Sequence, residues 1–257
     1  MLVIDRKYLI FKIKEVHFSD SPFDIEHCDS VTFHFCKNFV DAEGFTCQKV
    51  FTLIIDLTQD LDTIWQNMDR KSTRYSIKRA QKDGIKVRIN ENYSQFYRIY
   101  KSFIQKKGIN SLFGVGTVDL KTMKKYGTLF TAEHDGEILG GHLYLEDKGH
   151  IRLWLSASRR LEVSREKARL IGNANRLLHW EAMKYAKEKG IKEFDWGGLW
   201  SEEEADKDER KKAINSFKLS FGGEIVTRYS YQKVYSKAYR FAQYLYTLAS
   251  HGIRKGR

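Results

Sequence analysis

The segment Thr128–Ala157 constrains the fold most, because its pattern is typical of three consecutive antiparallel strands. The pair Asp135–Gly136 separates the first two strands and is a strong signal for a two-residue hairpin turn. A second turn at Asp147–Gly149 separates the next two. The expected strands are Thr128–His134, Ile138–Leu145 and His150–Ala157. We therefore predict an antiparallel meander.

Strand and helix patterns alternate on both sides of this meander. Before it we expect strands at Tyr8–Ile13, Val31–Cys36 and Val50–Leu57, a helix from about Leu61, and a helix over Tyr93–Lys107. After it we expect a helix from about Lys167 to Lys189 with Gly190 as its C-cap, a strand over Ile191–Trp196, a helix from about Glu209, a strand over Glu224–Val234 and a C-terminal helix. The order predicts an α/β (α+β) fold with a mixed, largely antiparallel sheet flanked by helices.

One lysine contradicts the pattern of its own helix. Ile214, Phe217, Lys218 and Phe221 are spaced as one continuous stripe on the helix from about Glu209. A lysine buried without a partner costs several kcal/mol or loses its proton. Lys218 therefore either reaches solvent past Phe217, pairs with a structural carboxylate, or points as a cation into a polar cleft.

The charge of the chain limits its partners. Lys and Arg number 45 against 33 Asp and Glu, which gives a formal net charge of +12. This balance favours phosphate-bearing partners, namely nucleic acid, a nucleotide-linked substrate or an anionic membrane surface. Neither a signal peptide nor a run of 18 apolar residues is present, so we expect a cytoplasmic protein without a transmembrane helix. Peripheral contact with the inner face of the membrane stays an open alternative.

Cys28, Cys36 and Cys47 lie near His27 and His34, but their spacing matches no standard zinc pattern. We expect reduced thiols and no metal site. Farther along, Lys71, Arg74, Lys78 and Lys82 recur at helical spacing, and Arg79 lies beside them. This basic stripe is either a solvated helix face or a contact for phosphate groups.

Five blocks carry a family resemblance over roughly Leu53 to Val234. They are IIDLTQDLDTIWQNMDRKSTRYSIKRAQKDGIKV, FTAEHDGEILGGHLYL, WLSAS, ANRLLHWEAMKYAKEKGIKEFDWGG and FKLSFGGE, in this order. The set resembles the Fem-type aminoacyltransferases, whose domains have the GNAT acyltransferase fold. The resemblance implies a GNAT-like domain over 91–235 and a truncated GNAT-like subdomain over 1–90. The aromatic and basic residues over 236–257 predict a C-terminal helix, which either docks on the N-terminal part or lies on a membrane surface.

The resemblance also implies a function. Fem-type enzymes transfer an amino acid from aminoacyl-tRNA to an amine of a peptidoglycan precursor, and relatives transfer other acyl groups in cell-envelope pathways. Their FK motif, whose lysine lies at the site of acyl transfer, corresponds to Phe217 and Lys218. No resident cofactor is implied, since aminoacyl-tRNA or acyl-CoA would serve as co-substrate.

Acyl-CoA-dependent GNAT enzymes hold the pyrophosphate in a basic, glycine-containing loop at a helix N-terminus. The corresponding segment SRRLEVSREKARLIGNAN is basic, but its only glycine is Gly172. Ordinary CoA binding is therefore poorly supported. The arginines of this segment, such as Arg165, could still bind phosphates through their side chains, unless they are simply solvated.

Further candidate residues surround Lys218 in the sequence. Asp195 ends a strand before Gly197 and Gly198, where it could accept a proton, orient the acceptor amine or cap the turn. Asn175 lies on the apolar side of its helix, as a cleft hydrogen-bond donor or a structural amide. Trp196 could stack on a base or sugar, or pack in the core.

Three functional hypotheses follow. The first is a Fem-like N-acyltransferase that uses aminoacyl-tRNA and a nucleotide- or lipid-linked amine. The second is an N-acyltransferase of surface polysaccharide or lipid synthesis that uses acyl-CoA or an acyl carrier. The third is an inactive GNAT-like module that binds RNA or membrane through its basic faces. Catalytic roles are assigned to Lys218 and Asp195, and substrate contacts to Lys71, Arg74, Lys78, Arg79, Arg165, Asn175, Trp196 and Phe217.

Overall fold

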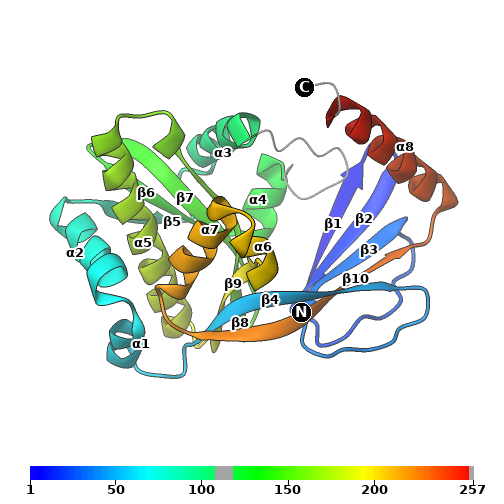
Figure 1. The fold of residues 1–257 in the computed structure, drawn as a ribbon, viewed down its shortest axis with the longest axis horizontal. Helices are drawn as coiled ribbons and strands as arrows, with labels where there is room; N and C mark the ends of the chain where they lie inside the picture. Colours follow the sequence, from blue (N-terminus) through cyan, green and yellow to red (C-terminus); the bar gives the residue numbers. More distant parts are fainter. Residues whose placement is uncertain (108–117, 255–257) are drawn as a thin grey trace. The chain divides into compact units, whose positions relative to one another are not determined.

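The computed structural model describes residues 1–107 and 118–254, with side chains up to residue 245 (Figure 1). The described chain divides into two compact units. Unit 1 consists of 1–50 and 227–254, and unit 2 of 51–107 and 118–226. The domain ranges expected from the sequence stay a prediction. In the structure, 51–90 belongs to unit 2, and the C-terminal helix belongs with the N-terminal strands.

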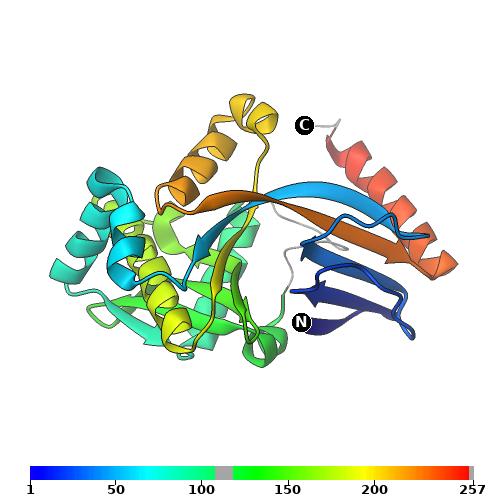
Figure 2. The same cartoon turned by 90° about the horizontal axis from the view of Figure 1, so that it is seen from below.

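Unit 1 contains the strands β1 (Leu2–Tyr8), β2 (Phe11–His17), β3 (Ser30–Cys36) and most of β10 (Glu224–Val234). β1 pairs with β2 and β3 with β10 in antiparallel fashion, whereas β2 and β3 are parallel. The C-terminal helix α8 (Lys237–Arg254) belongs to the same unit (Figures 1 and 2), and its Tyr239 packs edge-on against Phe11 at 5.1 Å between ring centroids.

One expected strand of unit 1 is wrong. Tyr8–Ile13 is not one strand but the end of β1, a turn at Leu9 and Ile10, and the start of β2, since Leu9 has a φ of +53° and the chain reverses between Tyr8 and Phe11. The turn contains no glycine or asparagine, which are the residues that normally mark such a reversal. The strands expected over Val31–Cys36 and Glu224–Val234 are confirmed.

Unit 2 is built on six strands in the order β4-β9-β8-β7-β6-β5. Their bounds are β4 (Thr46–Asp56, entering from unit 1), β5 (Lys86–Ile89), β6 (Thr128–His134), β7 (Glu137–Glu146), β8 (His150–Ser158) and β9 (Glu193–Leu199). Every neighbouring pair is antiparallel except β8 and β9, which are parallel. The predicted meander and the mixed, largely antiparallel fold class are confirmed.

Strand alternation gives this sheet two apolar faces. In β7, Leu139 and Tyr144 belong to one hydrophobic cluster, whereas Ile138 and Leu143 belong to the other. The first face packs against α5 (Arg165–Glu188) and the helices beside it (Figure 1), namely α1 (Leu61–Asn67) and α2 (Tyr75–Lys82). The π-helical turn η1 (Arg70–Arg74) directly precedes α2. The second face packs against α3 (Tyr93–Lys107) and α4 (Leu120–Tyr126).

Three short elements connect this core to the candidate site. The 3-10 turn η2 (Arg159–Leu161) precedes α5, and the helices α6 (Glu202–Asp206) and α7 (Glu209–Leu219) follow β9. α6 begins with a capping box formed by Ser201 and Glu204. Among the described helices, none is long and apolar enough to cross a bilayer.

Two glycines directly after α7 pack closely against β4 and the end of α1. Gly222 and Gly223 have φ values of +77° and +98°, which favour glycine. A Cβ on Gly223 would lie 2.5 Å from the carbonyl oxygen of Ile54 in β4, and one on Gly222 would lie 2.8 Å from that of Asn67. Only glycine allows this approach, which fixes the helix that carries Lys218.

Candidate functional site

The two parallel strands of unit 2 separate near their middle. β8 and β9 pair with each other at His150–Glu193, Ile151–Phe194 and Arg152–Asp195. Beyond these positions β8 continues to Ser158 and β9 to Leu199, and the two strands no longer pair with each other. The part of β9 beyond Asp195 therefore has main-chain groups that β8 does not bind. The candidate site lies at this divergence.

A buried ion pair closes the last paired position. Arg152 Nε donates to Asp195 Oδ2 at 2.7 Å, and Thr52 Oγ1 of β4 donates to Asp195 Oδ1 at 2.5 Å. The N–H of Gly197 donates to the same Oδ1 at 2.8 Å. Arg152 and Asp195 are only 6% and 3% exposed. One carboxylate thus joins three strands.

This environment determines the charge of Asp195. Burial alone raises the pKa of the carboxyl, but the Arg152 guanidinium and the hydrogen bonds from Thr52, Arg152 and Gly197 outweigh it, so the pKa lies below its usual value. The carboxylate is ionised and its donors surround it. These contacts favour a positioning role, and the predicted role of Asp195 in proton transfer stays a prediction.

Asp195 also shapes the strand that follows it. Gly197 has a φ of +66°, and a Cβ there would lie 3.2 Å from the carbonyl oxygen of Leu153. The pairing of β4 with β9 shifts register between Thr52 and Ile54, which marks a β-bulge at the same level. The bulge takes Trp196 and Gly197, with their carbonyls, out of the regular β4–β9 register, and Gly198 follows it.

Lys218 binds these carbonyls. Its Nζ lies 3.1, 3.3 and 2.7 Å from the carbonyl oxygens of Trp196, Gly197 and Gly198. Burial lowers the pKa of Lys218 to about 8, although Asp195 acts in the opposite direction. The side chain is half-buried and does not simply extend to solvent. Lys218 is therefore a cation held by main-chain dipoles, and its pKa lies below that of an exposed lysine.

The apolar stripe that singled out Lys218 is only partly buried. Phe221 is 1% exposed and Phe217 is half-buried, but Ile214 is 45% exposed. Phe217 and Phe221 pack against Trp196, with ring centroids 5.9 and 4.6 Å away. Trp196 is 1% exposed and lies in the core, so its proposed stacking on a substrate stays a prediction.

Two buried histidines continue this aromatic cluster. The His179 ring lies 4.2 Å from that of Trp196 and 4.0 Å from that of His142. Tyr144 Oη is 2.7 Å from His179 Nδ1, and Asn175 hydrogen-bonds His142. Burial lowers the pKa of His142 to about 3, against the effect of Asn175, and holds that of His179 well below its usual value. Both rings are neutral, and Asn175 serves here as the structural partner of His142.

Arg176 is a cation of this site that the sequence did not single out. Its guanidinium carbon lies 4.9 Å from the centre of the Phe217 ring, and Nη1 donates to Gly172 O at 3.3 Å. Its buried Nε has no partner among the described residues. Burial and then Arg160 lower its pKa, whereas Asp69 raises it. A guanidinium with a free donor beside Phe217 is suited to a carboxylate or phosphate.

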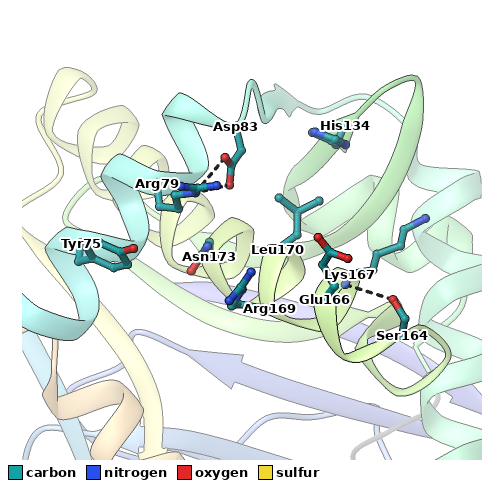
Figure 3. Close-up of a pocket in the computed structure, with 10 residues that line it drawn as sticks. All are labelled: Tyr75, Arg79, Asp83, His134, Ser164, Glu166, Lys167, Arg169, Leu170 and Asn173. Carbon is teal, nitrogen blue, oxygen red and sulfur yellow. Dashed lines mark hydrogen bonds and ion pairs between the residues drawn. The ribbon is translucent and has the colours of Figure 1, made fainter.

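A groove of about 610 Å³ lies between α2 and the start of α5 (Figure 3). It is lined by Tyr75, Arg79, Asp83, His134, Ser164, Glu166, Lys167, Arg169, Leu170 and Asn173. The groove brings together the two basic segments singled out in the sequence. Arg79 lines it, and Arg165 is an exposed residue of the first turn of α5 next to it.

The basic stripe is interrupted. Lys71 and Lys78 are exposed, and Lys78 lies over the Trp65 ring at 5.9 Å. Arg74 instead is half-buried and donates to Gln66 Oε1, because the π-helical turn Arg70–Arg74 changes the angular step between side chains. Arg79 forms an ion pair with Asp83. The stripe therefore offers fewer free cations than α-helical spacing implies.

The missed residues had a recognisable signal. Arg152 and His142 are polar residues inside strands that are otherwise apolar, HIRLWLSAS and EILGGHLYLE. A charged residue in such a strand is buried only with a partner. The same reasoning that selected Lys218 would have selected Arg152, although the sequence does not state that Asp195 is its partner.

Sequence comparisons identify related families. The model of the acetyltransferase (GNAT) domain matches residues 68–211, more than half of the 257 residues. The FemAB family model matches residues 12–112. No curated protein matches the chain. The resemblance predicted from the sequence is confirmed.

Solved structures share the fold. FemX is 14% identical with a TM-score of 0.63, over 96% of this chain and 85% of FemX. The C-terminal domain (DUF2156) of a putative lysylphosphatidylglycerol synthetase from Agrobacterium fabrum is 14% identical with a TM-score of 0.60, over 92% of this chain and 80% of that one. The L-PGS structure from Bacillus licheniformis is also 14% identical, with a TM-score of 0.53, over 79% and 67%.

We expect Arg152→Met to lower the free energy of unfolding by about 3–5 kcal/mol, because it leaves the Asp195 carboxylate buried without its counter-charge. The measurement is urea denaturation followed by circular dichroism. The control is Arg159→Met, which removes the exposed ion pair with Glu137 and should cost at most about 1 kcal/mol. The double variant Arg152→Met/Asp195→Asn should lose less than Arg152→Met alone. Equal losses for Arg152→Met and Arg159→Met would contradict the role of this ion pair.

Proposed function

Because the chain belongs to the acetyltransferase (GNAT) domain family and is an acyltransferase, we propose that it transfers an aminoacyl group from aminoacyl-tRNA to an amine. The proposed acceptor is a cell-envelope precursor of the peptidoglycan type. The FemAB match and the shared fold of FemX and of the lysylphosphatidylglycerol synthetase domain support this choice. We propose a cytoplasmic site of action, since such donors and precursors are made there.

One observation carries the choice of donor. The segment between β8 and α5 contains no glycine, and Gly172 lies inside α5 about two turns beyond its start. A glycine-containing loop that wraps a pyrophosphate with main-chain N–H groups is therefore not formed there. A tRNA donor does not require that loop, because its phosphates can be held by exposed side chains.

The basic side chains of the α2–α5 region supply such contacts. We propose that phosphate groups of the tRNA backbone, or the diphosphate of a nucleotide-linked acceptor, are bound by the side chains of Lys71, Arg74, Lys78, Arg79 and Arg165. Lys71 and Lys78 are exposed, and Arg79 lines the groove of Figure 3. The net charge of +12 favours the approach of a polyanion.

The chemistry proposed for Lys218 is stabilisation of the oxyanion. The acceptor nitrogen attacks the ester carbonyl of the aminoacyl-tRNA, a C–N bond forms, and the carbonyl oxygen becomes negatively charged. The C–O bond to the ribose then breaks, and the proton lost by the amine ends on the ribose hydroxyl. Lys218, in its protonated form, donates to the oxyanion in place of its longest hydrogen bond, the 3.3 Å contact to Gly197.

The other residues of the site position the reactants in this proposal. Asp195 holds the Gly197 bulge, and with it the carbonyls that orient Lys218. Phe217 and Arg176 form a cationic, aromatic surface next to Lys218 that is suited to a donor carbonyl or an acceptor carboxylate. Asn175 and Trp196 contribute through the aromatic cluster that supports this surface.

The donor choice is tested by offering the protein a mixture of labelled aminoacyl-tRNAs and acyl-CoAs together with amine acceptors. We expect an aminoacyl-tRNA to be consumed and an amide to form, and we expect tRNA binding to weaken steeply between 50 and 200 mM salt, by about tenfold or more. Lys71→Glu/Lys78→Glu should reduce tRNA affinity, whereas Lys121→Glu/Lys124→Glu on α4, equally exposed, should change it less.

Two outcomes of that experiment would overturn the proposal. Consumption of acyl-CoA with aminoacyl-tRNA left intact would favour N-acylation in surface polysaccharide or lipid synthesis. Tight binding of RNA or anionic vesicles with no donor consumed would favour an inactive binding module.

The role of Lys218 is tested by pH. A required protonated lysine with a pKa of about 8 predicts a transfer rate that falls as pH rises through about 8. Lys218→Arg keeps its charge throughout this range, so the ratio of the wild-type rate to the Lys218→Arg rate should fall through the same pH. This ratio cancels the ionisation of the acceptor amine. Lys218→Met should lower the rate by about 100-fold.

A rate ratio that is flat between pH 7 and 9.5, or that rises, would exclude a protonated Lys218 as the required form. Unchanged transfer by Lys218→Met would remove Lys218 from the mechanism altogether, whichever donor is used.

A further inference from the structure

A cluster of nitrogen and oxygen ligands lies in unit 1, among residues that the transfer site in unit 2 does not use. We propose that Glu15, His17 and His34 bind a divalent transition-metal ion of the zinc class on the sheet formed by β1, β2, β3 and β10. The inference is independent of the proposed transfer reaction, since none of its residues belongs to unit 2.

The strand register places the three side chains together. Glu15 and His17 are two residues apart on β2, so they lie on the same face of the sheet. His34 of β3 is the direct neighbour of His17 in the parallel β2–β3 ladder. The cluster therefore follows from strand geometry rather than from a flexible loop, and rigid elements make precise ligand sites.

The distances suit one ion after a small adjustment. One ligand atom from each of the three residues lies within 4.8 Å of the others. His17 Nε2 is 3.9 Å from Glu15 Oε2, and the His17 and His34 rings stack at 4.7 Å between centroids with 15° between their planes. Ligand atoms around an ion with bonds of about 2.1 Å lie about 3–4 Å apart. Side-chain rotations that move the ligand atoms by about an ångström would bring them to these separations.

Burial and a neighbouring cation prepare the carboxylate. His17 is 4% exposed, and the Glu15 side chain is 14% exposed. Arg6 of β1 donates to Glu15 Oε1 at 2.6 Å, which leaves Oε2 on the side of His17. A carboxylate that binds a metal is usually hydrogen-bonded by a neighbouring group, which fixes the orientation of the ligating oxygen. Arg6 is that group for Glu15. His34 is half-buried and gives the ion a route from solvent.

The ligand types select the class of ion. Two imidazoles and one carboxylate suit Zn²⁺ and related transition metals, whereas Ca²⁺ and Mg²⁺ prefer oxygen ligands alone. Three protein ligands leave a fourth position for water. The thiols of Cys28, Cys36 and Cys47, none of which forms a disulfide, are not part of the cluster, which is the only such group found among the described residues. The ion would tie β2 to β3.

The test is titration of the metal-stripped full-length chain with Zn²⁺ by isothermal calorimetry. We expect one ion per chain, and a Co²⁺ derivative should show visible d–d absorption. His34→Ala and Glu15→Gln should each weaken binding at least tenfold. Two control variants should bind as the wild type does. His27→Ala removes a histidine that is 90% exposed, and Cys47→Ser removes an exposed thiol.

Absence of Zn²⁺ binding by the wild type would overturn the proposal. So would binding that survives both His34→Ala and Glu15→Gln, or binding that is lost in His27→Ala or Cys47→Ser. Circular dichroism verifies that each variant is folded. If His34→Ala does not fold, the nearly isosteric Glu15→Gln decides the outcome.

Discussion

The buried ion pair between Arg152 and Asp195 is the interaction on which the rest of unit 2 depends. It lies at the last paired position of β8 and β9, and the same carboxylate binds Thr52 of β4 and the N–H of Gly197. Such a pair contributes little net stability compared with apolar packing, but it is costly to break. Its importance here is geometric, because it defines where the two strands part and where β9 bulges.

The divergence explains why a lysine is tolerated in a partly apolar helix. Carbonyl groups that leave a ladder need donors, and Lys218 supplies them to Trp196, Gly197 and Gly198. The same burial that makes this anchoring possible lowers the pKa of Lys218 to about 8. Anchoring and chemistry are thus two consequences of one placement. The neutral aromatic cluster of His179 and Trp196 packs against Phe217 of α7, next to Lys218, without adding charge.

Much of this arrangement could be predicted from the sequence. The DG hairpin, the long helix before Gly190 and the strand Glu224–Val234 follow from local patterns, and the structure confirms them. The turn at Leu9 could not, because it uses a positive φ at a residue that does not favour one. The continuous basic stripe expected over Lys71 and Arg74 is interrupted, because these residues lie in a π-helical turn, whose side-chain spacing differs from the 3.6-residue period of an α-helix. Lys218 was found by its misfit, but its carbonyl partners depend on a bulge between distant strands.

We infer that the Asp195 network holds Lys218 as a half-buried cation with a pKa of about 8. The most direct measurement is the titration of the Lys218 side chain by NMR, with ¹³C- and ¹⁵N-labelled lysine and Lys218→Arg to assign the signal. We expect a pKa of about 8, and a lower value in Asp195→Asn because the carboxylate raises it. A pKa near 10.4, the ordinary value for an exposed lysine, would show that the Asp195 network does not hold Lys218 in this way.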